Sequence, residues 1–321
     1  MPVIRRQVAG AGVAALTILL AGCAPSVLTV GPTRDYKLPS QAIASASSGD
    51  TVLIDPGTYH DCAVVRSSDV TIAGTGPGVV FAGKTCGGKA ILVTRGDDIT
   101  IRNLTLQHAQ VPDRNGAGIR AEGVGLTVDG VRFLDNEEGI LAGNKRGSVI
   151  RVLNSDFEGN GTCAGSGCAH GVYVAHIELL DVENSRFFRQ MVGHHIKSRA
   201  LKTIVKGNTI EDGPDGTASY EVDAPNGGNV DIENNTMEKG PKAQNWATVI
   251  AIGEERGKLP TDSLIIRNNK FTNDNEHQTI FVRNLSDGQA QLSGNILTGK
   301  VVPLQGPGTV QPASAAATPR S

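Results

Sequence analysis

The stretch Val182-Glu183-Asn184-Ser185-Arg186-Phe187 is one copy of a pattern that recurs along most of the 321-residue chain. Each copy has an apolar residue, two polar or small residues centred on Asn or Gly, and then another apolar residue. Successive copies lie 23 to 34 residues apart, and they begin at Ile101, Val128, Val152, Val182, Val205, Ile232, Ile266 and Leu292. A repeat of about 20 to 30 residues indicates a solenoid.

The residues around each copy indicate which kind of solenoid this is. Every repeat holds two or three runs of alternating β-forming residues and no amphipathic helical stretch, which excludes leucine-rich and helical repeats. Asn tolerates the left-handed backbone conformation that a sharp bend needs, and its side chain can hydrogen-bond to the Asn of the next coil. The pattern therefore predicts a parallel β-helix of stacked short strands.

The beginning of the repeat region carries a second signal. Residues 40–59, SQAIASASSGDTVLIDPGTY, contain a short helical stretch, a Gly-Asp turn, a strand and a Pro-Gly-x-Tyr turn. Together with the Asn repeats, this segment resembles the pectate-lyase-like right-handed β-helix superfamily over roughly residues 38 to 300. The resemblance implies an all-β fold, a single-stranded right-handed parallel β-helix with an N-terminal capping helix. Because a solenoid grows in one dimension, one domain is expected, over residues 38–302.

Composition agrees with narrow coils and many turns. Gly provides 40 of the 321 residues, and aromatic residues make up only 4%. The net charge of −2 gives no reason to expect nucleic acid as a partner.

The first residues resemble an export signal. A basic start, Met1 to Arg6, precedes an apolar run that is too short to span a bilayer. The run ends in Leu19-Leu20-Ala21-Gly22-Cys23, which resembles a bacterial lipobox. The resemblance implies a signal peptide at 1–22, a lipidated Cys23, and a linker over 23–37. Since Ala24 is not acidic, we expect a lipid anchor on the cell envelope, in the outer membrane; the alternative is a soluble secreted protein.

The other four cysteines suit an oxidising compartment. Cys62 and Cys86 are one coil apart and are expected to form one disulfide, and Cys163 and Cys168 a second one that closes a small ring. A metal site at Cys163 and Cys168 would need further ligands, and only His170 is near; no metal and no cofactor are therefore expected. Residues 303–321, rich in Pro, Ala, Ser and Gly, are predicted to be a disordered tail.

Chemistry in a β-helix must come from the outward rows or the loops, because alternate residues face the core. We expect an inward set of Ile119, Val172, Ile196, Val222, Ile252 and Val282. One outward row then contains Arg120, Leu141, Tyr173, His195, Glu221, Ala251 and Phe281. The next contains Lys197, Asp223 and Arg283, with His176, Arg199 and Glu254 at the strand ends. The reactive residue types gather on the middle coils, next to the long insertion at 158–170.

Two interpretations of this cluster stay open. In the first it is a catalytic site of Tyr173, His195, Lys197, Arg199, Glu221 and Asp223, with substrate bound by His176, Trp246, Glu254 and Arg283. In the second the charged residues are cross-strand ion pairs that hold the stack together. His194 is expected to face inward, although a register slip of one residue would exchange it with His195. Trp246 either stacks on a sugar ring or seals the edge of the core.

The segments at 169–174, 192–200 and 217–228 resemble those of bacterial exported β-helix proteins without an assigned activity. The reaction must therefore be inferred from the chemistry of the residues. Signatures of polygalacturonases and alginate epimerases are missing. Lys197 or Arg199 is suited to neutralise a uronate carboxylate, His195 to abstract the C5 proton, and Tyr173 to donate one. The leading hypothesis is a lyase or C5-epimerase for an acidic polysaccharide. The alternatives are an inverting hydrolase using Glu221 and Asp223, and a non-catalytic polysaccharide-binding protein.

Overall fold

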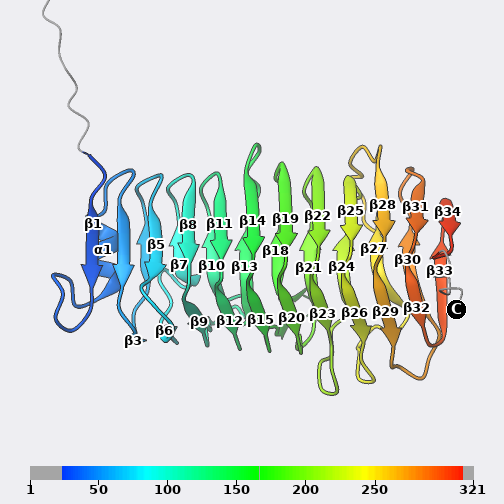
Figure 1. Ribbon diagram of the computed structural model, residues 1–321, viewed down its shortest axis with the longest axis horizontal. Coiled ribbons are helices and arrows are strands. Elements are labelled where there is room, and N and C mark those ends of the chain that lie inside the picture. Colours follow the sequence, from blue (N-terminus) through cyan, green and yellow to red (C-terminus); the bar gives the residue numbers. More distant parts are fainter. Residues whose placement is uncertain (1–23, 166, 314–321) are drawn as a thin grey trace, which may run out of the picture.

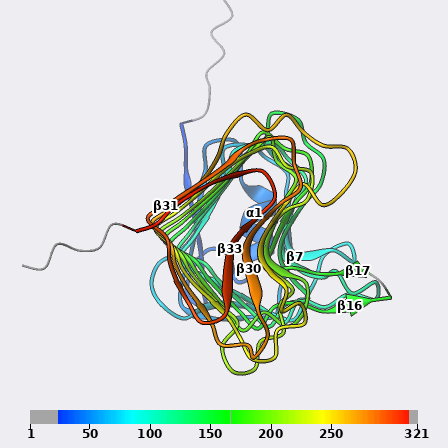
Figure 2. The ribbon, with the colours of Figure 1, turned by 90° about the vertical axis from the view of Figure 1, so that its right-hand side faces the viewer.

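A computed structural model describes residues 24–165 and 167–313. In these residues the chain winds into a right-handed parallel β-helix whose coils stack along one long axis (Figure 1). Each complete coil adds one strand to each of three parallel sheets, which enclose the core in the end view (Figure 2). The predicted fold class is confirmed.

The chain passes through the three sheets in the order A, B and C. Sheet A contains β1 (Val27–Val30), β2 (Thr51–Ile54), β5 (Thr71–Gly74), β8 (Ile99–Arg102), β11 (Leu126–Asp129), β14 (Val149–Leu153), β19 (Leu179–Glu183), β22 (Lys202–Lys206), β25 (Asn229–Glu233), β28 (Leu264–Arg267), β31 (Ala290–Ser293) and β34 (Gly308–Gln311). Sheet B contains β3 (Gly57–Tyr59), β6 (Val79–Ala82), β9 (Thr105–Gln107), β12 (Arg132–Leu134), β15 (Asp156–Glu158), β20 (Arg186–Phe188), β23 (Thr209–Glu211), β26 (Thr236–Lys239), β29 (Lys270–Asn273) and β32 (Ile296–Thr298). Sheet C contains β4 (Ala63–Val65), β7 (Ala90–Thr94), β10 (Ala117–Ala121), β13 (Glu138–Ala142), β18 (Val172–Val174), β21 (His194–Ser198), β24 (Tyr220–Ala224), β27 (Thr248–Ile252), β30 (Thr279–Asn284) and β33 (Val301–Gln305).

The repeated Asn pattern forms the corner between sheets A and B. The third residue of each of these copies has a left-handed backbone, with φ between 48° and 57° at Asn103, Asn154, Asn184, Asn234 and Asn268. The next residue bonds to its equivalent on the following coil: the backbone N–H and Nδ2 of Asn208 both donate to Asn235 Oδ1, at 2.9 and 3.0 Å. The same pair of bonds links Asn235 to Asn269 and Asn269 to Asn295. Both roles predicted for Asn are confirmed.

Apolar side chains from all three sheets fill the core. The six residues predicted to face inward on sheet C are all fully buried. Phe133, Phe157 and Phe187 of sheet B stack with ring centroids 4.5 Å apart at each step. On sheet C, a Cβ atom at Gly118 would lie 2.7 Å from the Phe133 ring, and one at Gly139 would lie 2.9 Å from the Phe157 ring. The glycines therefore make room for the aromatic stack.

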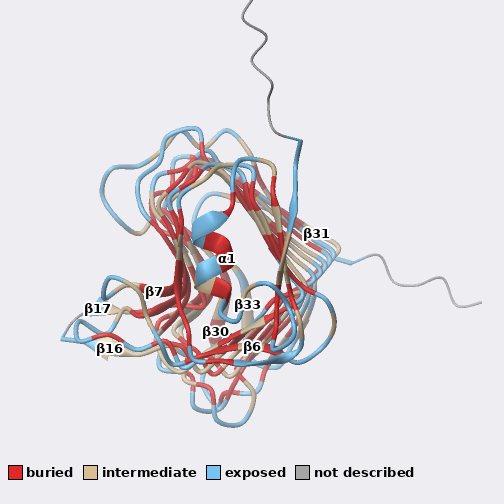
Figure 3. Cartoon of the chain, turned by 90° about the vertical axis from the view of Figure 1, so that its left-hand side faces the viewer, coloured by how far each residue is buried: buried red, intermediate tan, exposed pale blue. Residues whose placement is uncertain are grey.

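A short helix of about two turns closes the first coil. Helix α1 (Pro39–Ser45) lies across the open end and turns Ala42 and Ile43 into the core (Figure 3). The capping helix is thus confirmed, because without it the apolar residues of the first coil would face water. In the described part of the chain, no helix is long and apolar enough to cross a membrane.

The solenoid extends beyond its predicted limits at both ends. β1 lies in the expected linker at 23–37 and pairs with β2. β33 and β34 enter the expected disordered tail at 303–321 and pair with β30 and β31. These strands lack the Asn turn, so the periodic pattern missed them, although their backbone groups pair with the sheet edges. The predicted signal peptide at 1–22, the lipidation site Cys23, and residues 314–321 lie outside the described residues.

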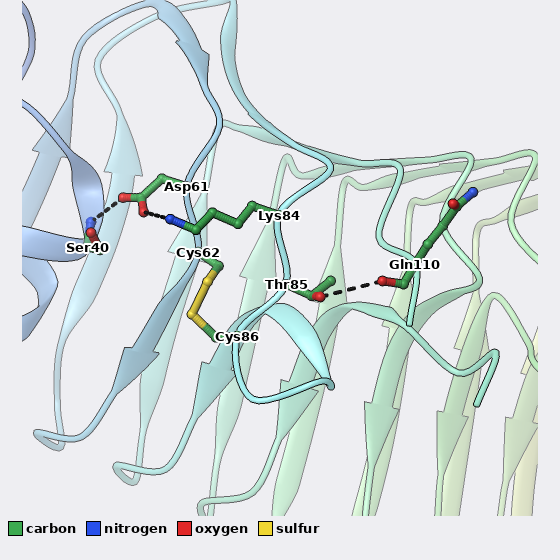
Figure 4. The surroundings of a disulfide bond; sticks show 7 residues. All are labelled: Ser40, Asp61, Cys62, Lys84, Thr85, Cys86 and Gln110. Atoms are coloured by element: carbon green, nitrogen blue, oxygen red, sulfur yellow. Dashed lines mark hydrogen bonds and ion pairs between the residues drawn. A yellow bond between two sulfur atoms is a disulfide. The ribbon is translucent and has the colours of Figure 1, made fainter. Parts of the chain in front are cut away.

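Both predicted disulfides form. Cys62 and Cys86 join neighbouring coils with their Cα atoms 5.5 Å apart, close to the Asp61–Lys84 ion pair (Figure 4). Asp61 Oδ2 also accepts a 2.8 Å hydrogen bond from the Ser40 backbone N–H, which fastens α1 to the next coil. Cys163 and Cys168 close the hairpin of β16 (Cys163–Ala164) and β17 (Gly167–Cys168), which projects from the solenoid (Figure 2).

Candidate functional site

Three polar side chains from consecutive coils form a row on the outer face of sheet C: Tyr173, Lys197 and Asp223. They are neighbours across β18, β21 and β24. The residues before them are likewise neighbours and are fully buried: Val172, Ile196 and Val222. Because side chains alternate along a strand, burial of these three turns the next residue of each strand outward. We call Tyr173, Lys197 and Asp223 the sheet C row.

Two cations beside this row share one carboxylate. Lys197 Nζ lies 3.2 Å from Asp223 Oδ2 and 3.4 Å from Glu255 Oε1. Arg199 Nη1 donates to Glu255 Oε2 at 2.6 Å, and its Nη2 donates to Glu255 Oε1 at 3.1 Å. The hydrogen bonds from Arg199 lower the pKa of Glu255. Glu255 is therefore an anion held between two cations, with 44% of its side chain exposed.

Arg199 also positions the tyrosine of the row. Its Nε donates to the Tyr173 hydroxyl oxygen at 3.1 Å, and Asn226 Oδ1 accepts from its Nη1 at 2.8 Å. Because the Tyr173 oxygen is the acceptor in this contact, its own O–H can donate to a bound molecule. The arrangement suits Tyr173 to act as a proton donor.

Aromatic rings line the strand starts next to the row. His170, His194 and Tyr220 come from consecutive coils and stack with centroids 4.8 Å apart at each step. His170 Nδ1 accepts from the His194 N–H at 3.0 Å, and His194 Nδ1 accepts from the Tyr220 N–H at 3.3 Å. Burial lowers the pKa of His170 to about 3 and that of His194 well below 6.5. Both rings are therefore neutral near pH 7 and form polar walls of the site.

Two carboxyl groups lie buried beneath the site. Burial raises the pKa of Asp223 to about 6, against the opposing effect of Lys197. Burial also raises the pKa of Glu138, at the start of β13, well above its usual 4.5. Asp223 Oδ1 and Glu138 Oε1 have no hydrogen-bond partner in the described part of the chain. Acids with raised pKa values in a cleft are typical of proton-transfer sites.

Two adjoining pockets give access to the row. One, of about 350 Å³, lies at the strand starts and is lined by His170, His194, Lys197, Ser219 and Gln244, with Gly167 and Cys168 of the hairpin at one side. The other, of about 460 Å³, lies towards the strand ends and is lined by Arg120, Leu141, Asn144 and His176. Tyr173 and Arg199 line both pockets. We call the two pockets together the sheet C groove.

The predicted outward row is wrong at three positions: His195, Glu221 and Phe281 face inward, with at most 1% of each exposed. Ala251 is also buried, but it keeps the outward register because it pairs with Asp223. In the strand register, His194 pairs with Tyr220 and Ile196 pairs with Val222. His195 and Glu221 lie between these pairs, at the bend where the chain passes from sheet B into sheet C. At this bend two successive side chains face the core, which breaks strict alternation. His194, expected inside, lines the groove instead.

Two of the misplaced residues, His195 and Glu221, belong to a buried polar cluster. His195 Nε2 lies 3.0 Å from Asp212 Oδ1, and Glu221 Oε1 lies 3.0 Å from Lys239 Nζ. Burial raises the pKa of Glu221 to about 8, although Lys239 opposes this shift. The Lys239 ammonium donates to the Ser219 carbonyl at 2.9 Å, which fixes the backbone beside Tyr220. Neither His195 nor Glu221 reaches the groove, so neither can contact a substrate there.

The predicted substrate-binding residues are spread over the groove and its surroundings. His176 lines the second pocket, where its Nδ1 lies 3.0 Å from Asn144 Oδ1. Arg283 lies 3.2 Å from Glu254, which also accepts a 2.8 Å hydrogen bond from the Tyr220 hydroxyl. Trp246 lines neither pocket.

Sequence reasoning missed His170, which lines the groove, and three residues that contact its lining: Tyr220, Asn226 and Glu255. The sequence pattern indicated His170 only as a possible metal ligand, and it did not single out Glu255. A signal for His170 and Tyr220 was present, because each begins or precedes a sheet C strand in the same way as His194. Glu255 and Asn226 come from turns of unequal length, so no periodic rule aligned them.

The described residues contain no group of three His, Cys, Asp or Glu side chains placed to hold a metal ion. A protein-family model described as "Right handed beta helix region" matches residues 147–305. A search of curated protein sequences gave no significant match.

Solved structures with similar folds were found. An alginate lyase from Paenibacillus sp. str. FPU-7 is 16% identical and superposes with a TM-score of 0.55, over 88% of this chain and 99% of that chain. A pectin methylesterase in complex with a hexasaccharide is 11% identical, with a TM-score of 0.40 over 85% and 79% of the two chains. The mannuronan C-5 epimerase AlgE6 A-module of Azotobacter vinelandii is 14% identical, with a TM-score of 0.37 over 88% and 94%. At such identities the likeness concerns the fold alone.

Proposed function

We propose that this chain, whose fold resembles the right-handed β-helices of the pectate-lyase-like superfamily, acts on an acidic polysaccharide as a lyase or C5-epimerase. Since a fold does not fix a function, the proposal rests on one observation in the groove. Tyr173, Lys197 and Arg199 converge there beside a carboxylate, Glu255, that both cations hold. The alginate lyase of similar fold is consistent with this substrate class.

Glu255 marks the position where a uronate carboxylate would bind. A substrate carboxylate in this position receives two parallel N–H donors from Arg199, which neutralises it, and lies beside Lys197. Neutralising this carboxylate acidifies the neighbouring C5–H bond, because the electrons left at C5 spread into the carboxylate as an enolate. Both proposed reactions begin with removal of this proton.

Lys197 and Tyr173 are placed to carry the two proton transfers. Lys197 passes a proton to Asp223, 3.2 Å away, and its free amine then takes the C5 proton. In the lyase reaction the C5 electron pair forms the C4=C5 double bond, the C4–O4 bond breaks, and Tyr173 protonates the departing oxygen. In the epimerase reaction Tyr173 instead returns a proton to the opposite face of C5. Arg199 stabilises the resulting phenolate through its Nε hydrogen bond.

This assignment replaces two earlier expectations. His195 is not the base, because it is buried against Asp212. An inverting hydrolase would need both Glu221 and Asp223 to act on the substrate. Glu221 cannot do so, because it is fully buried against Lys239. A non-catalytic polysaccharide-binding protein stays as the alternative outcome of the experiment.

The test uses polymannuronate, polyguluronate and polygalacturonate with the purified protein. A lyase produces ultraviolet absorbance from the unsaturated uronate, whereas an epimerase incorporates solvent deuterium at C5 without cleaving the chain. Lys197→Ala should abolish either signal, and Lys202→Ala, an exposed lysine of β22, should not. Binding without absorbance or deuterium would favour the non-catalytic alternative, and neither binding nor turnover of any uronate would reject the proposal.

We further propose that Cys23 carries a lipid anchor that holds the protein to the bacterial cell envelope. Support comes from the lipobox resemblance in the sequence. Cys23→Ser should move the exported protein from the membrane fraction to the soluble fraction, and a variant that stays in the membrane fraction would reject the anchor.

A further inference from the structure

We propose that Trp246 and His277 form a stacking subsite for a sugar ring of the same polymer, on the C-terminal side of the sheet C groove. This inference rests on the proposed function for the identity of the ligand. It adds a binding position outside both pockets and sets the direction in which the polymer runs.

The two rings form an exposed pair on neighbouring coils. Their centroids lie 4.7 Å apart, with 36° between the ring planes. Trp246 is 44% exposed, and 49% of the His277 side chain is exposed. Exposed aromatic faces of this kind can bind sugar rings through the C–H groups of the sugar. The pair therefore offers a platform rather than a core contact.

Buried asparagines hold the platform in place. Trp246 lies in the loop 240–247 that follows β26, and His277 lies in the loop 274–278 that follows β29; both loops project from the same corner (Figure 1). Asn275 Nδ2 donates to the Gly240 and Pro241 carbonyls at 3.3 Å, and its Oδ1 accepts from the His277 N–H at 3.0 Å. Asn273 Nδ2 donates to the His277 carbonyl at 2.8 Å. Preorganised rings lose little entropy when a ligand binds.

The platform lies at the same corner as the stacked rings of His170, His194 and Tyr220 but earlier in its coils, because the residue opposite Tyr220 on the next coil is Thr248. His170, His194, Tyr220, Trp246 and His277 precede or begin five successive strands of sheet C: β18, β21, β24, β27 and β30. Successive coils lie about 4.8 Å apart, so the platform is one to two coils from Tyr220. Gln244, on the Trp246 loop, lines the first pocket. The loop thus joins the groove to the platform.

The opposite side of the first pocket is bounded differently. Gly167 and Cys168 of the disulfide-closed hairpin line it there. A polymer that leaves this pocket along the corner therefore meets the hairpin in one direction and the aromatic platform in the other. We infer that the polymer runs along the solenoid axis from the sheet C row towards Trp246 and His277.

The experiment exploits the fact that Trp246 is the only Trp of the chain. Tryptophan fluorescence, excited selectively over that of tyrosine, therefore reports on this ring alone. Titration of the full chain with oligomers of the three uronates should change the emission of Trp246 for the oligomer that binds. Trp246→Ala and His277→Ala should weaken binding of long oligomers, measured by calorimetry, by about tenfold for Trp246. Trp246→Phe should recover most of the affinity.

Matched controls separate this inference from the proposed function. Leu285→Ala removes an apolar side chain of similar exposure, 40%, from the other end of β30 and should leave binding unchanged. In Lys197→Ala, turnover should be lost while the fluorescence change persists. If oligomers are turned over but neither change Trp246 emission nor bind more weakly to Trp246→Ala, the subsite is rejected and the proposed function stands. If they bind with a fluorescence change but are never turned over, the subsite stands and the reaction is rejected.

Discussion

Two polar rows run along the same coils and differ in nearly every respect. At the corner between sheets A and B, Asn208, Asn235 and Asn269 repeat one hydrogen-bond pattern from coil to coil. On the outer face of sheet C, a tyrosine, a lysine and an aspartate occupy the equivalent positions of successive coils. The first row is buried and fully paired, whereas the second borders a groove and leaves Asp223 Oδ1 without a partner.

The difference follows from what each row has to satisfy. A buried Asn ladder forms the same hydrogen bonds at every coil. If one coil has another residue in place of the Asn, buried polar groups on the neighbouring coils lose their hydrogen-bond partners. A site that transfers protons needs different groups at neighbouring positions, and it needs free donor or acceptor capacity for the substrate. Regular polar rows in a solenoid therefore indicate stability, and irregular ones indicate chemistry.

The largest effect is expected from Tyr173→Phe, which removes only the proposed proton donor. Turnover should fall by about 100-fold or more, as is usual for loss of a general acid, with little change in melting temperature. Tyr36→Phe, far away beside α1, serves as the control. If Tyr173→Phe lowers the melting temperature while turnover per folded molecule persists, the row on sheet C is structural like the Asn ladder.

The reciprocal change is Asn235→Ala. It removes the acceptor for two Asn208 donors and the 2.9 Å bond to the Val205 carbonyl. Leaving such buried groups unpaired costs about 3 kcal/mol or more, which corresponds to a melting temperature lower by roughly 6 °C or more. Turnover by the folded molecules at low temperature should not change. A large loss of specific activity in Asn235→Ala would show that the two rows are not independent.

The two rows should contribute differently to the pH dependence of stability, because the sheet C row contains a carboxyl group and the Asn ladder does not. Burial raises the pKa of Asp223 from its usual 3.8 to about 6. Between these values the folded protein binds more protons here than the unfolded chain, so stability falls as pH rises from about 4 to 6. The loss is at most about 3 kcal/mol, since one pKa unit corresponds to about 1.4 kcal/mol. Urea midpoints measured across this range should show the slope in the wild type and in Asn235→Ala.

Substitution of single carboxyl groups shows which residue causes the dependence of stability on pH. Asp223→Asn should make the slope shallower below about pH 6, and Glu221→Gln should reduce the part that continues towards pH 8, because burial raises the pKa of Glu221 to about 8. Asp287→Asn, whose side chain is 96% exposed, should leave the slope as it is. A slope of the same size in Asp223→Asn would mean that this carboxyl group is not the source.

The Asn ladder could be predicted from the sequence more fully than the sheet C row. The Asn turn recurs at nearly constant spacing, and its left-handed φ and its bonds follow from the chemistry of Asn alone. The general position of the site was also predictable, because reactive residue types gather on the middle coils. Its register was not. At the bend into sheet C the chain turns two successive side chains inward, so strict alternation placed His195 and Glu221 outside when they are buried.

The smallest effect is expected from Glu255→Gln, and it bears on what distinguishes the groove from a structural ion-pair ladder. If Glu255 occupies the place of the substrate carboxylate, neutralising it should free Arg199 and Lys197 and lower the KM for uronate oligomers. Since the carboxylate is 44% exposed and its ion pairs are screened by solvent, the change should be only about twofold to fivefold. It should shrink as salt is added, because salt screens exposed charges. Glu254→Gln is the matched control, since its neighbouring carboxylate pairs with Arg283 and Tyr220 instead. A higher KM in Glu255→Gln would mean that this residue orients the two cations for the substrate, and the row and its partners would then have to be regarded as one fixed charge network.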